Sequence, residues 1–191
     1  MSPARARKPG KPARGSVAAL GPVFHALQFA AWKHRDQRRK DLEASPYINH
    51  PIALANVLWR EGGVHNPAVL TAALLHDTIE DTDTTAEELR EQFGQRVASI
   101  VMEVTDDKSL DKATRKRMQV THAPRLSREA KLVKLADKIC NLRDIAVGAP
   151  ITWPVSRQRE YFDWAKRVVD GLRGVSPRLE KIFDQVYAER P

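Results

Sequence analysis

Cysteine is nearly missing from this chain of 191 residues, which contains only Cys140. A single cysteine excludes disulfide bonds within the chain and any metal site built from several thiolates. This scarcity is typical of a reducing compartment, so we expect a cytoplasmic location. Long apolar runs are missing too, because no segment approaches the roughly 20 apolar residues of a membrane-spanning helix. The first apolar segment is interrupted by Gly21 and Pro22, and we expect no secretory signal.

Acidic residues are missing from the first 16 residues, MSPARARKPGKPARGS, which carry five Lys or Arg side chains of a chain whose net charge is +8. The segment has no apolar periodicity, so residues 1–16 are predicted to form a disordered basic tail. Weak nucleic-acid binding or a targeting role stays open for this tail. The whole chain is 42% hydrophobic and 29% charged, which predicts one compact domain over residues 17–191.

Alternating apolar and polar residues, the pattern of a half-buried strand, are not found over a sufficient length, and no internal repeat is present. After residue 17 the apolar residues recur with helical spacing, so the predicted fold class is all-α. Asn66, Thr85, Ser127 and Ser176 are expected to cap helices at their N-termini. The predicted helices are 22–36, 51–61, 67–80, 85–93, 95–105, 111–121, 128–145, 156–173 and 177–189.

One segment, ALLHDTIEDTD, begins as a buried helix and ends in an acidic cluster. The predicted helix brings His76, Asp77, Glu80 and Asp81 together on its last turn, because residues three or four apart share a face. Negative side chains at a helix C-terminus oppose the helix dipole. A bound divalent cation would reverse this effect. The alternative is an acidic helix end exposed to solvent, without a ligand.

Two further segments supply groups that bind metals. PYINHP places His50 directly before a predicted helix, and KLVKLADKICNLRD places Asp137 among apolar residues in the middle of another. A half-buried carboxylate needs a partner, and a salt bridge to Lys134 or Arg143 is one alternative. The other is a metal site, since two imidazoles and two carboxylates suit a borderline divalent ion and leave positions for water and substrate. Its ligands would be His50, His76, Asp77 and Asp137.

The order of the motifs YINHP, ALLHDTIEDT and KLADKICNLRD resembles that of the HD-domain hydrolases. More narrowly, the chain resembles the hydrolase domain of the RelA/SpoT alarmone enzymes, and among them the stand-alone small alarmone hydrolases, which include metazoan relatives of SpoT. KHRDQRRKD, EVTDDKSL and QREYFDWAKRVVDGL extend the resemblance over about residues 24–190. It implies a single HD-domain helical bundle. Because the chain ends where the long enzymes continue into a synthetase domain, alarmone synthesis is not expected.

The resemblance also implies roles for individual residues. It places Glu80 and Asp81 at the pair that positions and activates the attacking water, and Asn141 near the ribose. Arg38 stands where the long enzymes have an aromatic residue, which leaves substrate preference open. The implied cofactor is one manganese ion, Mn²⁺, bound by His50, His76, Asp77 and Asp137. The positions that match the basic loop beside the site and the contacts to the substrate's phosphates or sugar are Arg39, Lys40, Lys112, Arg157 and Tyr161.

General chemistry supports a phosphate ester as the substrate. A divalent ion lowers the pKa of a water molecule, and a nearby carboxylate accepts the proton. The phosphorus under attack carries negative charge, which cations must offset. Candidates for this role around the acidic cluster are Arg39, Lys40, Lys138 and Arg143. The resemblance therefore implies a metal-dependent (p)ppGpp 3′-pyrophosphohydrolase, which releases pyrophosphate and leaves GDP or GTP.

Two other functions stay open on the sequence. One is a phosphatase acting on NADPH, or another HD-domain nucleotide phosphohydrolase. The other is a non-catalytic module that binds nucleotides or nucleic acid, against which the intact pair of Glu80 and Asp81 argues. The expected partner is a small guanosine polyphosphate. Neither a membrane nor a nucleic acid is an expected partner, and homo-oligomerisation is left open.

Overall fold

The computed structural model describes residues 20–41, 43–150 and 152–191. Helices make up the regular structure of these residues, which contain no β-strand beyond one isolated bridge between Arg38 and Pro46. The predicted all-α class is therefore confirmed. The basic tail predicted for residues 1–16 lies outside the described residues.

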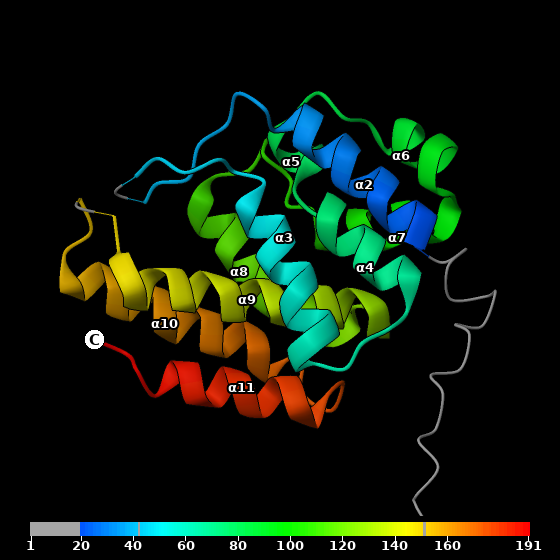
Figure 1. Cartoon of the computed structure of the whole chain (residues 1–191). Coiled ribbons are helices and arrows are strands. Elements are labelled where there is room, and N and C mark those ends of the chain that lie inside the picture. The colour runs from blue at the N-terminus through cyan, green and yellow to red at the C-terminus, as the bar shows by residue number, and fades with distance from the viewer. Residues whose placement is uncertain (1–19, 42, 151) are drawn as a thin grey trace, which may run out of the picture.

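Figure 1 shows the helices in chain order. Up to residue 93 the elements are α2 (Leu20–Lys33), α3 (Asn49–Asn56), the π-helical turn η1 (Val57–Glu61), α4 (Pro67–Leu75), α5 (Thr78–Asp81) and α6 (Ala86–Phe93). They are followed by α7 (Gln95–Val104), α8 (Lys112–His122), the 3₁₀ turn η2 (Ala123–Arg125), α9 (Arg128–Gly148), α10 (Val155–Asp170) and α11 (Pro177–Tyr187).

Side-chain caps begin four of these helices at the predicted residues. Asn66 and Thr85 accept hydrogen bonds at 3.0 and 3.1 Å from backbone N–H groups two and three residues ahead. Ser127 and Ser176 accept equivalent bonds at the starts of α9 and α11. These bonds satisfy N–H groups that have no partner inside the helix. Short-range sequence therefore sets where the four helices start.

The predicted single helix over 67–80 is wrong. α4 ends at Leu75, and Asp77 adopts φ −101° and ψ −2°, which lies in the bridge region of backbone conformations. Thr78 Oγ1 donates a hydrogen bond to the Leu75 carbonyl oxygen at 2.7 Å and so satisfies a carbonyl group at the end of α4. Residues 75–78 contain neither glycine nor proline, so the local pattern does not predict the break.

This break changes the electrostatics of the acidic cluster. Glu80 and Asp81 belong to the single turn of α5 rather than to the last turn of a long helix. The acidic side chains therefore do not face the negative end of a long helix dipole, and the predicted destabilisation from that dipole does not apply. His76 and Asp77 lie in the connection between α4 and α5. The case for a cation rests instead on the charges that the fold buries together.

The predicted helix over 51–61 also differs from the structure at its start. α3 begins at Asn49, so His50 lies inside its first turn rather than before it, and the last turn is the π-helical η1. The helix ends before Gly62. A Cβ atom at this position would lie 2.8 Å from Leu179 Cδ2 and 2.8 Å from the Leu58 carbonyl oxygen. Only glycine fits this close approach without displacing α11.

Helix α9 runs through the middle of the molecule and packs against α3, α4, α7, α10 and α11 (Figure 1). Its apolar residues Leu135, Ile139 and Leu142 are fully buried. Asp137 and Lys138 on the same helix are also buried, which is uncommon for charged residues unless they are paired. The centre of α9 therefore carries both the apolar core and a buried charged cluster.

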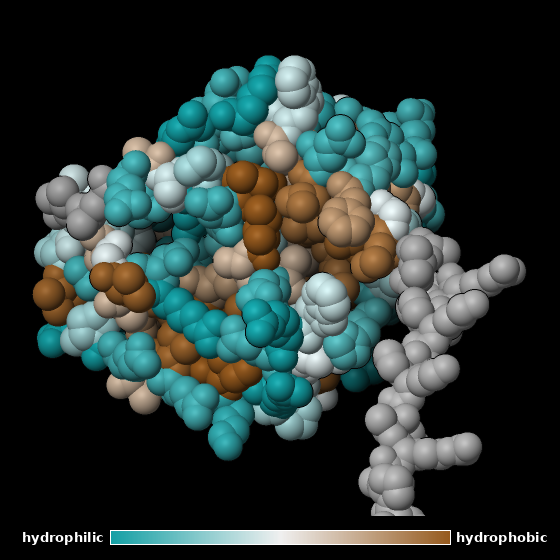
Figure 2. All heavy atoms as spheres, in the orientation of Figure 1, coloured by the Kyte–Doolittle hydropathy of each residue, from teal (hydrophilic) through white to brown (hydrophobic). Residues whose placement is uncertain are grey.

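The face shown in Figure 2 has hydrophobic side chains gathered near its middle and hydrophilic side chains around them. Exposed hydrophobic residues of the chain include Phe24 of α2 and Ile52 of α3. Within the described residues, none of the helices combines the length and the apolar character that crossing a bilayer requires.

Candidate active site

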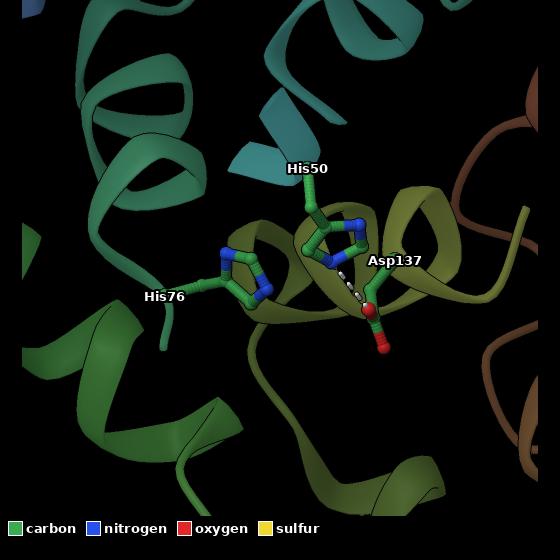
Figure 3. Close-up of side chains that lie close together, drawn as sticks. All are labelled: His50, His76 and Asp137. Atoms are coloured by element: carbon green, nitrogen blue, oxygen red, sulfur yellow. Dashed lines mark ion pairs between the residues drawn. The ribbon is translucent and has the colours of Figure 1, made fainter. Parts of the chain in front are cut away.

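Three helices bring nitrogen and oxygen donors to one point. His50 lies in the first turn of α3, His76 directly follows α4, and Asp137 lies in the middle of α9. One donor atom from each of the three side chains lies within 4.8 Å of the other two. Figure 3 shows the two imidazole rings and the Asp137 carboxylate turned toward a common space. The structure thus assembles three of the four predicted metal ligands, although they are far apart in the sequence.

His76 is oriented for binding a cation. Its Nδ1 lies 2.8 Å from the Ala73 carbonyl oxygen, so this nitrogen carries the proton of the hydrogen bond. Its Nε2 is buried and has no hydrogen-bond partner among the described residues, although it lies 2.9 Å from a carboxylate oxygen of Asp77. A ring nitrogen held by a backbone carbonyl on one side and directed at carboxylates on the other is typical of metal-ligating histidines.

Asp77, the fourth predicted ligand, sits beside this group. Its carboxylate accepts a hydrogen bond from the hydroxyl of Tyr47, and burial alone would raise its pKa. The neighbouring His76 outweighs burial and holds the pKa of Asp77 well below its usual range. Asp77 is therefore an anion at neutral pH, and Tyr47 fixes its orientation.

Asp137 accepts contacts on both of its oxygens. His50 Nε2 lies 3.3 Å from Oδ1, and Asn141 donates to Oδ1 at 2.6 Å. Lys138 Nζ donates to Oδ2 at 2.9 Å. Burial opposes ionisation, but Lys138 and His50 outweigh it, so the pKa of Asp137 lies well below its usual value. Asp137 is a buried anion that the surrounding donors orient.

The alternative partners considered for Asp137 lie elsewhere. Arg143 forms a bidentate pair with Glu61, with both N–O distances at 2.8 Å. Lys134 donates to the Val104 carbonyl oxygen at 2.9 Å, and burial lowers its pKa. The alternative of a salt bridge from Asp137 to Lys134 or Arg143 is therefore not what the structure shows, and the cation that Asp137 meets is its neighbour, Lys138.

The charges around His76 favour a cation at this point. Burial alone would lower the pKa of His76, but the carboxylates of Asp77 and Asp137 outweigh burial and raise the pKa to about 9. The cluster therefore attracts positive charge, either as a proton on the imidazole or as a metal ion that displaces it. Two imidazoles and two carboxylates are a donor set that fits a divalent transition-metal ion.

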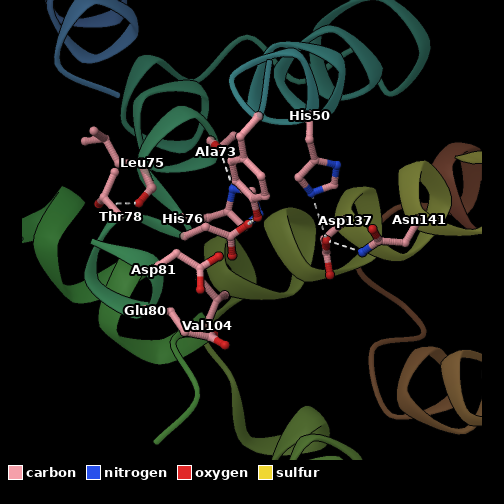
Figure 4. Close-up of polar contacts among 12 residues, drawn as sticks. His50, Ala73, Leu75, His76, Thr78, Glu80, Asp81, Val104, Asp137 and Asn141 are labelled. Carbon is pink, nitrogen blue, oxygen red and sulfur yellow. Dashed lines mark hydrogen bonds and ion pairs between the residues drawn. The ribbon is translucent and has the colours of Figure 1, made fainter. Parts of the chain in front are cut away.

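Glu80 and Asp81 of α5 lie beside the predicted metal ligands (Figure 4). Glu80 Oε2 accepts a hydrogen bond from the backbone N–H of Asp106 at 3.2 Å, and Lys108 forms an ion pair with Asp81. Burial, followed by the charges of Asp77 and Asp106, raises the pKa of Glu80. A carboxylate with a raised pKa is a better proton acceptor near neutral pH.

A cavity of about 210 Å³ opens over this cluster. All six of the predicted metal ligands and water-activating acids line it. Three of the predicted substrate contacts, Arg39, Asn141 and Tyr161, line it as well. Burial raises the pKa of the Tyr161 hydroxyl to about 12, so this group is a neutral hydrogen-bond donor. The cavity therefore joins the cation site to groups that can bind a phosphate or a sugar.

The other three predicted substrate contacts do not line this cavity. Lys40 is exposed in the connection between α2 and α3, and Lys112 begins α8. Arg157 stacks over the ring of Trp153 at 4.3 Å. A substrate that extends beyond the cavity would be needed to reach these side chains, so their role stays a prediction.

Several residues of the site were not singled out from the sequence. Tyr47 belongs to the motif PYINHP and Asp106 belongs to EVTDDKSL. Both motifs were recognised in the sequence, but these two residues were not identified as part of the site. Trp164 carries Lys138 over its ring at 4.4 Å and Lys116 at 4.8 Å. No short-range pattern connects α8, α9 and α10, so only the fold reveals this contact.

A family model, curated relatives and a solved structure all relate this chain to the HD-domain proteins. Residues 26–161 match the protein family described as HD domain. The chain is 55% identical over 175 residues to guanosine-3′,5′-bis(diphosphate) 3′-pyrophosphohydrolase MESH1 of Xenopus tropicalis, which covers 92% of this chain and 97% of that protein. The protein of the same name from Drosophila melanogaster is 50% identical over 167 residues, covering 87% and 93%. A solved structure, of a metazoan orthologue of SpoT that hydrolyses ppGpp, matches with a TM-score of 0.86 at 45% identity, covering 97% of this chain and 98% of that one.

Proposed function

The chain belongs to the HD-domain family, and on that premise we propose that it is a metal-dependent guanosine-3′,5′-bis(diphosphate) 3′-pyrophosphohydrolase. It hydrolyses ppGpp or pppGpp to GDP or GTP and releases pyrophosphate. The observation that supports this proposal most strongly is that donor atoms of His50, His76 and Asp137 lie within 4.8 Å of one another, in a cavity that the acids of α5 also line. Relatives at 50–55% identity that carry this activity in their names support the substrate.

The proposed ion site consists of His50, His76, Asp77 and Asp137. The buried Nε2 of His76, which faces a carboxylate oxygen of Asp77 at 2.9 Å, and the low pKa values of Asp77 and Asp137 support a divalent cation. Manganese is our proposal for its identity, based on the resemblance to the alarmone hydrolases. When bound, such an ion lowers the pKa of a water molecule and offsets negative charge on phosphate.

The residues of α5 handle the proton. Water attacks the phosphorus that is joined to the 3′ oxygen of the ribose, so one proton must leave the water and one must reach the 3′ oxygen. Glu80 and Asp81 are the proposed acceptors, because both line the cavity beside the ligands. The raised pKa of Glu80 supports this role, since a carboxylate that accepts the proton readily can also return it to the leaving oxygen.

Cationic and neutral donors are proposed to hold the rest of the substrate. Arg39 lines the cavity and pairs with Asp144, which a phosphate group can replace. Asn141 and Tyr161 are proposed to contact the sugar or the phosphates from α9 and α10. Lys40, Lys112 and Arg157 are proposed to meet phosphates outside the cavity. Charge-assisted bonds of this kind are stronger than neutral ones, which favours a polyanionic substrate.

Two further expectations remain proposals. The cytoplasmic location expected from the single cysteine is one of them. The other is that the chain acts on a small molecule without a membrane or nucleic-acid partner, alone or as a homo-oligomer.

Product analysis tests the function. The full chain is loaded with manganese and offered ppGpp, pppGpp and NADPH in parallel. We expect GDP from ppGpp and GTP from pppGpp, each with an equal amount of pyrophosphate, and no turnover after chelation of the metal. Release of single phosphate from NADPH, with the guanosine substrates unchanged, would identify a nucleotide phosphatase instead. Binding of all three without any product would point to a non-catalytic module.

A further inference from the structure

Glu80 is held by the segment that joins α7 to α8 and by the beginning of α8. The backbone N–H of Asp106 donates to Glu80 Oε2 at 3.2 Å. Arg115, in the first turns of α8, places Nη1 at 3.6 Å from Glu80 Oε1. Each oxygen of this carboxylate thus has its own partner, and both partners come from one stretch of ten residues, from position 106 to position 115.

The segment itself is anchored to its surroundings. Gln119 Nε2 of α8 donates to Asp106 Oδ2 at 2.6 Å. Lys134 of α9 is buried, donates to the Val104 carbonyl oxygen at 2.9 Å and lies 4.0 Å from Asp106 Oδ1. These contacts tie the segment to α9, the helix that also carries Asp137. The distance between the partners of Glu80 and the ion site is therefore set by the core rather than by a free loop.

Arg115 is separate from the substrate contacts. Its side chain is 25% exposed and does not line the cavity over the ion site, whereas Glu80 does. The contact of Arg115 in this structure is with the Glu80 carboxylate, so we expect its effect on the reaction to pass through Glu80. Fixing both oxygens also restricts the terminal torsion of the side chain, which is broad for a free glutamate.

We propose that Arg115 is a positioning residue, which together with the Asp106 N–H holds the Glu80 carboxylate in the one orientation that faces the attacking water. This inference rests on the proposed function, in which Glu80 accepts the water's proton. Correct placement of a reacting group is worth a large part of the rate, because a carboxylate free to rotate spends most of its time misaligned. Removing Arg115 should therefore affect the chemical step more than substrate binding.

The test compares Arg115→Ala, Arg115→Lys and a matched control, Arg117→Ala, in the full chain. Arg117 carries the same charge on the same helix, is exposed, and donates to Thr114 Oγ1 at 2.7 Å. We expect Arg115→Ala to lower kcat for ppGpp by about 10–100-fold, the usual cost of losing such a supporting contact. KM and the affinity for manganese in calorimetry should stay close to the parent values. Arg115→Lys should recover most of the rate, and Arg117→Ala should leave it unchanged.

A double-mutant cycle with Glu80→Gln separates positioning from a general structural role. If Arg115 acts through Glu80, Arg115→Ala should cost less than about 2-fold in kcat once Glu80 is already replaced. The reason is that both changes disrupt the same interaction between the two side chains. An equal loss in both backgrounds, or no loss in either, would overturn the inference. Should Arg115→Ala fail to fold by circular dichroism, Arg115→Met replaces it, because it keeps the aliphatic part of the side chain.

A second readout does not depend on turnover. In a crystal structure of the manganese-loaded Arg115→Ala protein, the Glu80 carboxylate should leave its contact with the Asp106 N–H, while the ligands of the ion stay in place. Unchanged placement of Glu80 would contradict the inference. Failure of the parent protein to release pyrophosphate from ppGpp would instead refute the proposed function, and these two results are told apart by measuring the parent first.

Discussion

The seam between α11 and the helices beneath it is stabilised differently from the ion site, although both are buried. At the seam, α11 packs on α9 and η1, where Leu58, Leu179 and Phe183 are fully buried. Each such side chain contributes about 1.5–3 kcal/mol by leaving water. At the ion site the fold buries His50 and Asp137 instead, and burying charges costs free energy unless partners compensate.

The difference indicates how stability and function are divided in this molecule. The seam has no residue that lines the cavity, so it supports the fold without entering the chemistry. The proposed ion site contains ion pairs, and its acids would be offset by the proposed cation. Helix α9 contributes to both regions, since Ile139 and Leu142 are fully buried while Asp137 and Lys138 face the cavity. Substitutions at the seam should therefore change stability, and substitutions at the ion site should change activity.

The largest expected effect separates metal binding from proton transfer. Glu80→Gln and Asp81→Asn should lower turnover of ppGpp by about 10²–10⁴-fold, the usual contribution of a positioned base, while manganese still binds. His76→Ala should lose both, because it removes a ring nitrogen directed into the site. Steady-state kinetics and calorimetry with manganese check these outcomes. Parent-level turnover in the Glu80 and Asp81 variants would mean that another group accepts the proton.

The seam should respond in the opposite way. Phe183→Ala should lower the free energy of unfolding by about 3–5 kcal/mol, because a fully buried ring leaves a cavity. Turnover per folded molecule should stay near the parent value. Lys181→Ala, at an exposed position of the same helix, is the control and should change neither quantity. Urea unfolding measures the first quantity, and kinetics below the transition measure the second. A lower kcat without lower stability would show that the seam contributes to catalysis as well as to stability.

A smaller effect is expected where the cavity meets the substrate. Arg39→Ala removes a cation that lines the cavity and should cost about 1.5–3 kcal/mol, which corresponds to roughly 10–150-fold in kcat/KM for ppGpp. Lys40→Ala, at the exposed neighbouring position, should cost less than about 5-fold, because solvent weakens the proposed contact of an exposed charge with a phosphate. Manganese binding should be unchanged in both variants.

A substrate with fewer phosphates sharpens the Arg39 result. The loss caused by Arg39→Ala should be much smaller for such an analogue, because one charge-assisted contact is absent in both proteins. An equal loss on both substrates would show that Arg39 supports the structure through its pair with Asp144. No loss on either would place it outside the binding site.

The smallest expected effect is a gain in stability at the ion site. The pKa of Glu80 is raised in the folded protein, so the stability it contributes is fully present below its ordinary pKa of about 4.3 and is lost as pH rises through the raised value. The Glu80→Gln protein has no carboxyl group to ionise at this position and does not lose this stability as pH rises. In metal-free protein at pH 7, Glu80→Gln should therefore unfold at a higher temperature than the parent.

The pH dependence supplies the check. The gain in melting temperature from Glu80→Gln should shrink toward zero as the pH approaches 4, where the parent carboxyl is protonated in both states. Glu91→Gln, at an exposed position of α6, is the control for loss of one negative charge. A gain that persists unchanged at low pH would show that Glu80 is destabilising for a reason other than its charge.

Short-range sequence was sufficient for most of the helices and for the identity of the proposed ligands. Caps such as Ser127 and Ser176 act on N–H groups within three residues, so their effect can be read locally. The helical spacing of apolar residues predicted an all-α fold because it describes one face of one helix. The motifs around His50, His76 and Asp137 pointed to a divalent metal through their residue types and their resemblance to a family.

Only the tertiary structure decided which groups meet. Asp77 lies at the break between α4 and α5, and its carboxylate is held by Tyr47 from another segment. Asp137 pairs with Lys138 rather than Lys134, because packing of α9 turns Lys134 toward the end of α7. The two partners of Glu80 likewise come from beyond α7. Contacts of this kind depend on how helices pack around α9, and packing distances between segments are not encoded in any short stretch of sequence.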